Sequence, residues 1–302
     1  MNCYQRGYTL IELMVSLLLG SMLIAGFGSL FVQTQKSAAI QRSLSYMMED
    51  GRYILEVFGR ELRRAGSLRS KKTASGDPTI VFTADSNVLG STMSFASGDY
   101  IRGEYNAAGF GAAGDKPYNI NRLALRYQLN NNTELAVTDP NSTNSACERS
   151  ILLTTGEDPA TQTHVVTLYF YVALDSSNVP VLYCKAKRVN FNDATATSNP
   201  TSAAEPLISN VQMLVITYGI DTDADGAANY YVGETTINSF TSAQWQQVVS
   251  AKLSVVLQSA DDNLATSSVT YTIDGATGSP FTASDKRLYR VSSTTIALRN
   301  TI

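Results

Sequence analysis

The stretch RGYTLIEL, residues 6–13, runs directly into an apolar segment that ends near Val32. Between Leu13 and Val32 about 20 residues carry no charge, and at 1.5 Å per residue in a helix they match a hydrocarbon core of roughly 30 Å. The segment can therefore span a bilayer. Glu12 sits near its start, where an unpaired carboxylate costs on the order of 2.5–3.5 kcal/mol. We expect Glu12 to have a partner and a function.

The polar leader before this segment is too short for an ordinary secretory signal peptide. Such a signal has a basic start, an apolar stretch of about 7–15 residues and a small-residue cleavage site behind it. Here the apolar run is longer, and no site of the A-x-A kind follows it. An ordinary single-span anchor is the remaining alternative.

The order of residues in this region resembles the class III signal of type IV pilins and type II secretion pseudopilins. A short basic leader, residues 1–7, ends in Gly7 and is followed by an aromatic residue, Thr-Leu-Ile-Glu and the apolar run. The resemblance implies that a prepilin peptidase cleaves after Gly7 and methylates the new N-terminus at Tyr8. Glu12 is then the fifth mature residue, the assembly glutamate of the family. The family usually begins with Phe, so Tyr8 is a departure that concerns methylation more than cleavage.

Composition leaves room for a large exported part. The chain has 302 residues, of which 44% are hydrophobic and 16% charged. About 235 residues remain beyond the helix, which is enough for one large domain or two small ones. The formal net charge of −3 provides no overall attraction to nucleic acid or anionic lipid, so any such binding has to be local.

Cys147 and Cys184 are the two cysteines that remain when the leader, which contains Cys3, is removed. An even number of cysteines in an oxidising compartment is typical of a disulfide. Closing a loop of about 37 residues stabilises a fold by roughly 3–4 kcal/mol in the chain-entropy model. Two buried thiols are the alternative.

The helix is expected to continue well past the apolar segment. Apolar residues recur at spacings of three and four from Ile40 to Leu62, and Gly66 is suited to end the helix. A helix from Tyr8 to about Ala65 is roughly 85 Å long. We expect residues 8–34 to form its transmembrane and assembly half, and residues 35–66 to form an amphipathic half that packs on the head.

From about Thr79 the pattern changes to short β-rich runs separated by Gly, Asn, Asp, Ser and Pro. These runs predict an α+β fold of the type IV pilin kind, in which the long N-terminal helix packs on an antiparallel β-rich head, residues 67–302. The expected strands are Thr79–Ala84, Tyr100–Tyr105, Leu123–Leu129, Ser150–Thr154, His164–Leu174, Val179–Arg188, Val211–Ile220, Val248–Ser259, Val269–Ile273 and Arg287–Leu298.

Two local signals refine this prediction. Asn178 and Pro180 between two strong strands indicate a hairpin turn, which would bring Cys184 beside the strand that starts at His164. Thr241 and the glutamine three residues later fit a capping box, which predicts a short helix that carries Trp245.

Four further segments resemble minor pilins of the PilW type. They lie toward both ends of the chain, at residues 51–53, 60–66, 218–223 and 294–300. The resemblance leaves the middle of the chain, about residues 76–206, uncovered except by length. The J-type minor pseudopilin of type II secretion is the nearest alternative.

This resemblance implies a non-enzymatic subunit that helps to initiate type IV pili and is incorporated at or near their tip. Twitching motility, adhesion and DNA uptake are the processes that it implies. The implied partners are other minor pilins, the major pilin, the prepilin peptidase, the inner-membrane assembly machinery and a tip adhesin. The precursor would be an inner-membrane protein with a periplasmic head, which becomes extracellular on assembly. A tip module that binds a ligand is the alternative from another functional class.

The loop that begins at Asp221 has the pattern of a partial calcium site. Asp221, Asp223 and Asp225 occupy positions 1, 3 and 5 of a calcium loop, with glycine at position 6 and Asn229 at position 9. Position 12 is Val232, so the bidentate glutamate is missing and we expect weak Ca²⁺ binding. A solvated turn between strands is the alternative.

Two other candidates are better explained by structure than by chemistry. Basic residues gather between Arg60 and Lys72, but such residues complement the dipole at the end of a helix, and no aromatic ladder for nucleic acid accompanies them. Direct nucleic-acid binding is therefore not expected. His164 has no neighbouring catalytic partner in sequence, and no G-x-S-x-G elbow occurs, so no catalytic residues are assigned.

Overall fold

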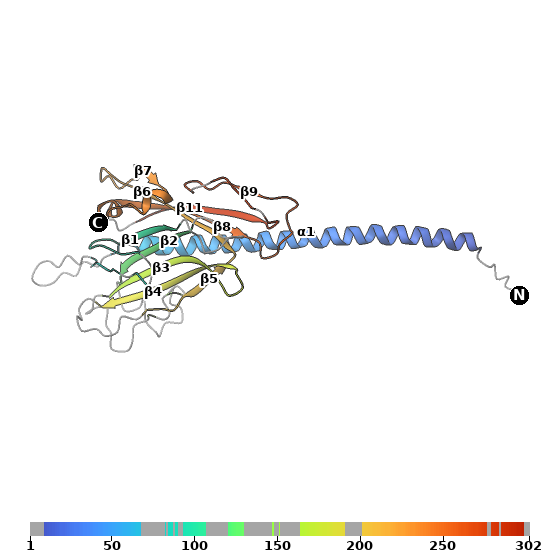
Figure 1. The fold of residues 1–302 in the computed structure, drawn as a ribbon, viewed down its shortest axis with the longest axis horizontal. Helices are drawn as coiled ribbons and strands as arrows, with labels where there is room; N and C mark the ends of the chain where they lie inside the picture. The colour runs from blue at the N-terminus through green and yellow to red at the C-terminus, as the bar shows by residue number, and fades with distance from the viewer. Residues whose placement is uncertain are drawn as a thin grey trace, which may run out of the picture.

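The computed structural model describes residues 9–67, 82, 84–86, 88–89, 93–106, 120–129, 147, 151, 164–190, 201–276, 279–283 and 285–298. Helix α1, Leu10–Arg64, runs without interruption for 55 residues. Its first half projects far beyond the head, and its second half lies against the sheet (Figure 1). The helix ends at Gly66, whose φ of 75° is left-handed and whose N–H donates to the carbonyl of Arg126 at 2.9 Å.

The head is built around one large sheet with two short helices at its side. The strands in the described residues follow the order β11-β8-β6-β2-β3-β4-β5, with β1 paired to β2, β7 paired to β6, and β9 and β10 forming a separate pair. Their bounds are β1 Ile101–Asn106, β2 Ile120–Gln128, β3 His164–Leu174, β4 Pro180–Asn190, β5 Glu205–Ser209, β6 Val211–Ile220, β7 Tyr230–Val232, β8 Val248–Gln258, β9 Thr270–Tyr271, β10 Phe281–Thr282 and β11 Tyr289–Ala297. The short helices are α2 Glu234–Ile237 and α3 Ser242–Gln246.

The sheet consists of two antiparallel parts that meet at one narrow seam. Among the described residues, strand β2 pairs with β6 in parallel at one position, Ile120 opposite Leu214. The side-chain amide of Asn121 strengthens the seam by donating to the carbonyl of Leu214 at 3.1 Å. The hydroxyl of Tyr100 also crosses it and donates to the carbonyl of Val248 at 2.8 Å. Because few strand bonds cross the seam in the described residues, the shared core is the main connection between the two parts there.

Helix α1 supplies that core by packing on both parts. On the β11 side, Gly51 lets the helix approach closely, since a Cβ there would lie 2.5 Å from Oγ of Ser292. On the other side, the rings of Phe58 and Phe170 in β3 are 4.8 Å apart. Ile54, Phe58 and Leu62 are at most 1% exposed. The amphipathic half of the helix is therefore the spine of the head.

The predicted α+β class is confirmed, and the strands at His164–Leu174 and Val211–Ile220 have the predicted bounds. The 178–180 turn and the capping box of Thr241 also form, and Trp245 is buried. The sequence missed the short elements β5, β7, β10 and α2, because segments this short have no clear period. Most of the strands expected at 79–84 and 150–154 lies outside the described residues.

Candidate assembly site

The first half of α1 is an apolar surface without a partner in the described residues. Its large hydrophobic side chains from Leu10 to Val32 are between 53 and 78% exposed. Nothing lies within 4 Å of a Cβ built at Gly20, Gly26 or Gly28. In the described part of the chain, α1 is the one helix long and apolar enough to cross a membrane. Such a surface is stable in lipid or among other helices.

Glu12 lies in the first turn of α1 and is exposed. Thr9 is the N-cap, and its hydroxyl accepts from the backbone N–H of Glu12 at 3.3 Å. None of the ion pairs among the described residues involves Glu12. Gly7 and Tyr8, the predicted cleavage and methylation positions, lie outside the described residues. The helix therefore carries the carboxylate at its membrane-inserted end, where it is available to another group.

The basic residues at the other end of α1 have structural contacts. Glu61 is fully buried, and its carboxylate accepts from Nε of Arg60 at 2.9 Å and from Nη1 of Arg64 at 3.3 Å. The Arg64 guanidinium also lies 4.0 Å from the centre of the Tyr127 ring. The rest of the cluster, from Arg69 to Lys72, lies outside the described residues. In the described residues, Arg60 and Arg64 of this cluster make contacts where the helix meets the head.

The predicted disulfide is present between Cys147 and Cys184, whose Cα atoms are 5.7 Å apart. Both sulfur-bearing side chains are fully buried. Cys184 lies in β4 opposite Phe170 of β3, as the predicted hairpin requires. The disulfide attaches Cys147 to the hairpin of β3 and β4.

The aspartates of the 221–226 loop gather as the sequence predicted. Asp221, Asp223 and Asp225 each offer a carboxylate oxygen within 4.8 Å of the others. Burial of Asp221 opposes its ionisation, but backbone N–H groups that donate to its carboxylate, including Gly226 at 2.8 Å and Ala224 at 2.7 Å, lower its pKa. The loop thus holds Asp221 ionised with its oxygens already in hydrogen bonds.

Asn229 lies beside this cluster and makes hydrogen bonds within the loop. Its side-chain oxygen accepts from the N–H of Thr222 at 2.6 Å, and its amide donates to the carboxylate of Asp223 at 3.3 Å. Binding of a cation by this oxygen would require a change in the Thr222 contact. In the described residues, three carboxylates converge in this loop.

His164 is buried at the start of β3, and its Nδ1 lies 3.2 Å from Nη1 of Arg188. The same Arg188 donates through Nε to the carbonyl of Ile151 at 3.0 Å. The histidine therefore belongs to a buried polar contact between β3 and β4.

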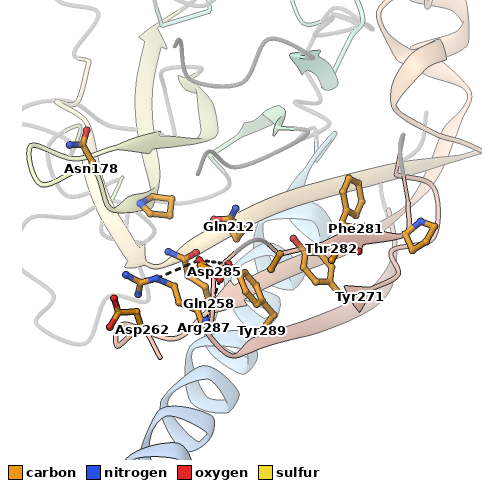
Figure 2. Close-up of a pocket in the computed structure, with 13 residues that line it drawn as sticks. Asn178, Gln212, Gln258, Asp262, Tyr271, Phe281, Thr282, Asp285, Arg287 and Tyr289 are labelled. Atoms are coloured by element: carbon orange, nitrogen blue, oxygen red, sulfur yellow. Dashed lines mark hydrogen bonds and ion pairs between the residues drawn. The ribbon is translucent and has the colours of Figure 1, made fainter. Parts of the chain in front are cut away.

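A cavity of about 450 Å³ lies on the outer side of the sheet, beside β9 and β10 (Figure 2). Tyr271 stacks between Phe281 and Tyr289, with ring centres 5.8 and 5.3 Å apart. Two charged groups at its wall, Asp285 and Arg287, have partners within the protein. The Tyr289 hydroxyl donates to the Asp285 carboxylate at 2.8 Å, and Nη1 of Arg287 donates to the carbonyl of Ser259 at 2.6 Å. Burial and the Asp285 carboxylate both raise the pKa of Tyr289.

A long N-terminal helix with an exposed apolar half, carried on an α+β head, defines the class of type IV pilin-like proteins, and comparison with known families supports this. Residues 2–28 match the prokaryotic N-terminal methylation motif. Residues 169–300, from β3 to just behind β11, match type IV pilus-assembly protein W. The chain is thus similar to type IV pilins of the PilW type, and its N-terminal motif and apolar helix are those of a single-pass inner-membrane protein that is later incorporated into the pilus. No curated protein and no solved structure matches it.

One feature of the site was not accessible to sequence analysis. A strand was predicted at 287–298, but a single sequence contains no signal for strand order. The structure puts this strand, β11, at the edge of the sheet and next to α1.

Proposed function

We propose that this minor pilin acts at the start of pilus assembly and occupies a position at or near the tip. The observation that carries the proposal is the division of α1: an exposed apolar half with one carboxylate in its first turn continues without a break into the buried spine of the head. A helix built in this way ties the position of the head to the packing of the membrane half. Assembly in the membrane is then transmitted to the head as a rigid-body movement.

Glu12 is the residue through which assembly acts in this proposal. Cleavage after Gly7 creates an ammonium group at Tyr8 of each mature subunit. The carboxylate of Glu12 pairs with the N-terminal ammonium of a neighbouring subunit, because each charge alone is costly in a medium of low dielectric constant. The pairing selects one axial offset between neighbouring helices, and apolar contacts along the two spans then add to it.

The size of the head supports a low-copy position. About 235 residues lie beyond the helix, and a filament made only of such heads would be crowded around its axis. A few copies at the tip avoid this conflict. The twitching, adhesion and DNA-uptake roles follow from the activity of the pilus that this subunit helps to start.

Replacement of Glu12 by alanine tests the proposal. We expect Glu12→Ala to leave processing after Gly7 and the folding of the head intact, since Glu12 has no contact with either core or disulfide. When Glu12→Ala is the only copy of the protein in the cell, co-purification of other pilins, surface piliation and twitching should fall. Glu49→Ala, which removes an exposed carboxylate from the same helix beyond the span, is the matched control and should preserve all three.

Two outcomes would contradict the proposal. Normal piliation with a defect in secretion of folded proteins would identify a subunit of a type II secretion system. Normal piliation and normal secretion with Glu12→Ala would remove the assigned role of the glutamate.

A further inference from the structure

The two edges of the large sheet differ in how far they are open to another strand. At one edge, β5 has five residues, contains Pro206, and pairs with β4 through a register shift between Leu182 and Tyr183. At the other edge, β11 has nine residues without proline or a register shift. Proline, short length and irregular pairing are the means by which proteins close an edge. The β5 edge is therefore protected, and the β11 edge is not.

The register identifies the backbone groups that face this open edge. Two hydrogen bonds bracket the pairing of β11 with β8: the N–H of Leu298 donates to Val249 and that of Ser259 donates to Leu288, both at 2.8 Å. Since bonded positions alternate in an antiparallel pair, the even-numbered residues of β11 bond to β8. The odd-numbered residues point their N–H and C=O groups away from it. Among the described residues, β8 is the one strand that pairs with β11.

The open edge is continuous with the assembly surface of α1. Gly51 is the helix position in contact with Ser292 of β11. Leu44 and Met48 precede Gly51 by seven and three residues, so they lie on the same stripe of the helix. They are 36% and 54% exposed, although both are apolar. An exposed apolar stripe thus leads from the membrane half of α1 to the side of the helix that carries β11.

We propose that the open edge of β11 binds an extended strand from the head of a different pilin subunit in the same assembly. Main-chain hydrogen bonds to Val291, Ser293 and Thr295 would provide the pairing, as in other cases of strand addition. The stripe of Leu44 and Met48 would be covered by the same neighbour. This inference rests on the proposed function and names the surface through which the head recognises its partner.

The direction of the strands and the poor edge strand β5 together argue for a different subunit and against a second copy. Symmetric antiparallel pairing of two β11 strands would point the two α1 helices in opposite directions, so both spans could not enter one membrane in the same sense. Subunits that stand parallel can instead place β11 against the far edge of a neighbouring head. In this fold, β5 at that far edge runs opposite to β11. Its short length and Pro206 make it a poor strand for pairing, so a neighbour with a longer edge strand fits better.

A proline at Thr295 tests the inference in the full-length protein. Thr295 is exposed and its N–H faces the open edge, so Thr295→Pro removes an outward donor and retains every bond to β8. We expect normal abundance, processing and melting temperature. The amount of other pilins that co-purify with the tagged chain should fall about tenfold, because a pairing hydrogen bond is lost and the ring obstructs the strand. Thr295→Ala keeps the N–H and should stay within about twofold of the unmodified chain.

A photo-crosslinker at an adjacent outward position provides a readout that does not depend on proline. Ser293→p-benzoylphenylalanine in the unmodified background should crosslink to the head of a different pilin, within one extended segment. Crosslinks only to a second copy, or none at all in assembled pili, would overturn the inference. So would a folded Thr295→Pro protein that retains its partners as well as Thr295→Ala does.

Deletion of the gene separates this inference from the proposed function. If deletion leaves piliation intact, the proposed function fails. If deletion abolishes piliation while the folded Thr295→Pro protein restores it together with all partners, the strand-addition inference fails and the proposed function stands.

Discussion

Phe27 and Phe58 lie in the same helix, and their environments are opposite. Phe27 is 69% exposed, whereas Phe58 is fully buried against Phe170 of the sheet. Backbone conformation and residue type are the same at both positions, so the difference comes from what surrounds the helix. The first half of α1 has to find its partners in lipid or in other subunits. The second half finds them in its own head, which gives the head a core that does not depend on assembly.

Truncation of the two phenylalanines tests this contrast most directly. Phe58→Ala should destabilise the head by about 3–5 kcal/mol, because it leaves a cavity between α1 and β3. Phe27→Ala should leave the stability of the head unchanged. Urea unfolding of the full chain in detergent, followed by fluorescence of Trp245, measures both effects. Equal losses in the two variants would show that the halves of α1 are not independent.

Removal of the disulfide tests whether the head is stabilised separately from the helix. The double variant Cys147→Ser with Cys184→Ser should lower the free energy of unfolding by roughly 3–4 kcal/mol, since the unfolded chain gains freedom. The same urea titration, with and without reductant, measures the effect. Reductant should destabilise the unmodified chain and have no effect on the double variant. Insertion of the span into the membrane should be unaffected in both.

Glycines in the two halves of α1 should respond differently to a larger side chain. Gly51→Val should cost about 1–3 kcal/mol, because the new side chain meets Ser292 and Leu257 where helix and sheet are in close contact. Gly26→Val has open space around it and should leave the head unchanged. Thermal melting of the head separates the two. A similar shift for both glycines would argue against close packing at Gly51.

Calcium binding should change the stability of the head without a change in α1. We predict weak binding by Asp221, Asp223 and Asp225, so millimolar Ca²⁺ should stabilise the head by about 1 kcal/mol. Chelator should reverse the shift in melting temperature, and Asp223→Ala should abolish it. Glu205→Ala, a carboxylate on β5, is the control. Absence of a calcium-dependent shift in the unmodified chain would leave the loop as a turn held by its own hydrogen bonds.

Local signals in the sequence were sufficient for several parts of the candidate site. The period of three and four from Ile40 to Leu62 predicted the buried face of α1, and Gly66 ends the helix as expected. The turn at Asn178 fixed the register that brings Cys184 to β3. The spacing of the aspartates from Asp221 onward predicted that their carboxylates lie close together. In each case, the residues that interact are close in sequence or joined by one turn. Few alternative conformations are therefore open to them.

Other features depend on contacts between distant segments. The amide of Asn229 turned toward Thr222 and Asp223, which the spacing of a calcium loop does not predict. The short strands β5, β7 and β10 form because longer neighbours offer them bonding partners. Their own sequences are too short to specify them.

By itself, the sequence determined a membrane-spanning helix with one carboxylate, an amphipathic continuation and a β-rich head, because these depend on hydrophobic period and length. Only the tertiary structure decided that β2 lies parallel to β6 where Ile120 meets Leu214 and that β11 lies at an open edge beside Gly51. Strand order is set by which distant strands bury their side chains together under α1. That choice is a property of the whole core, and no local stretch of residues encodes it.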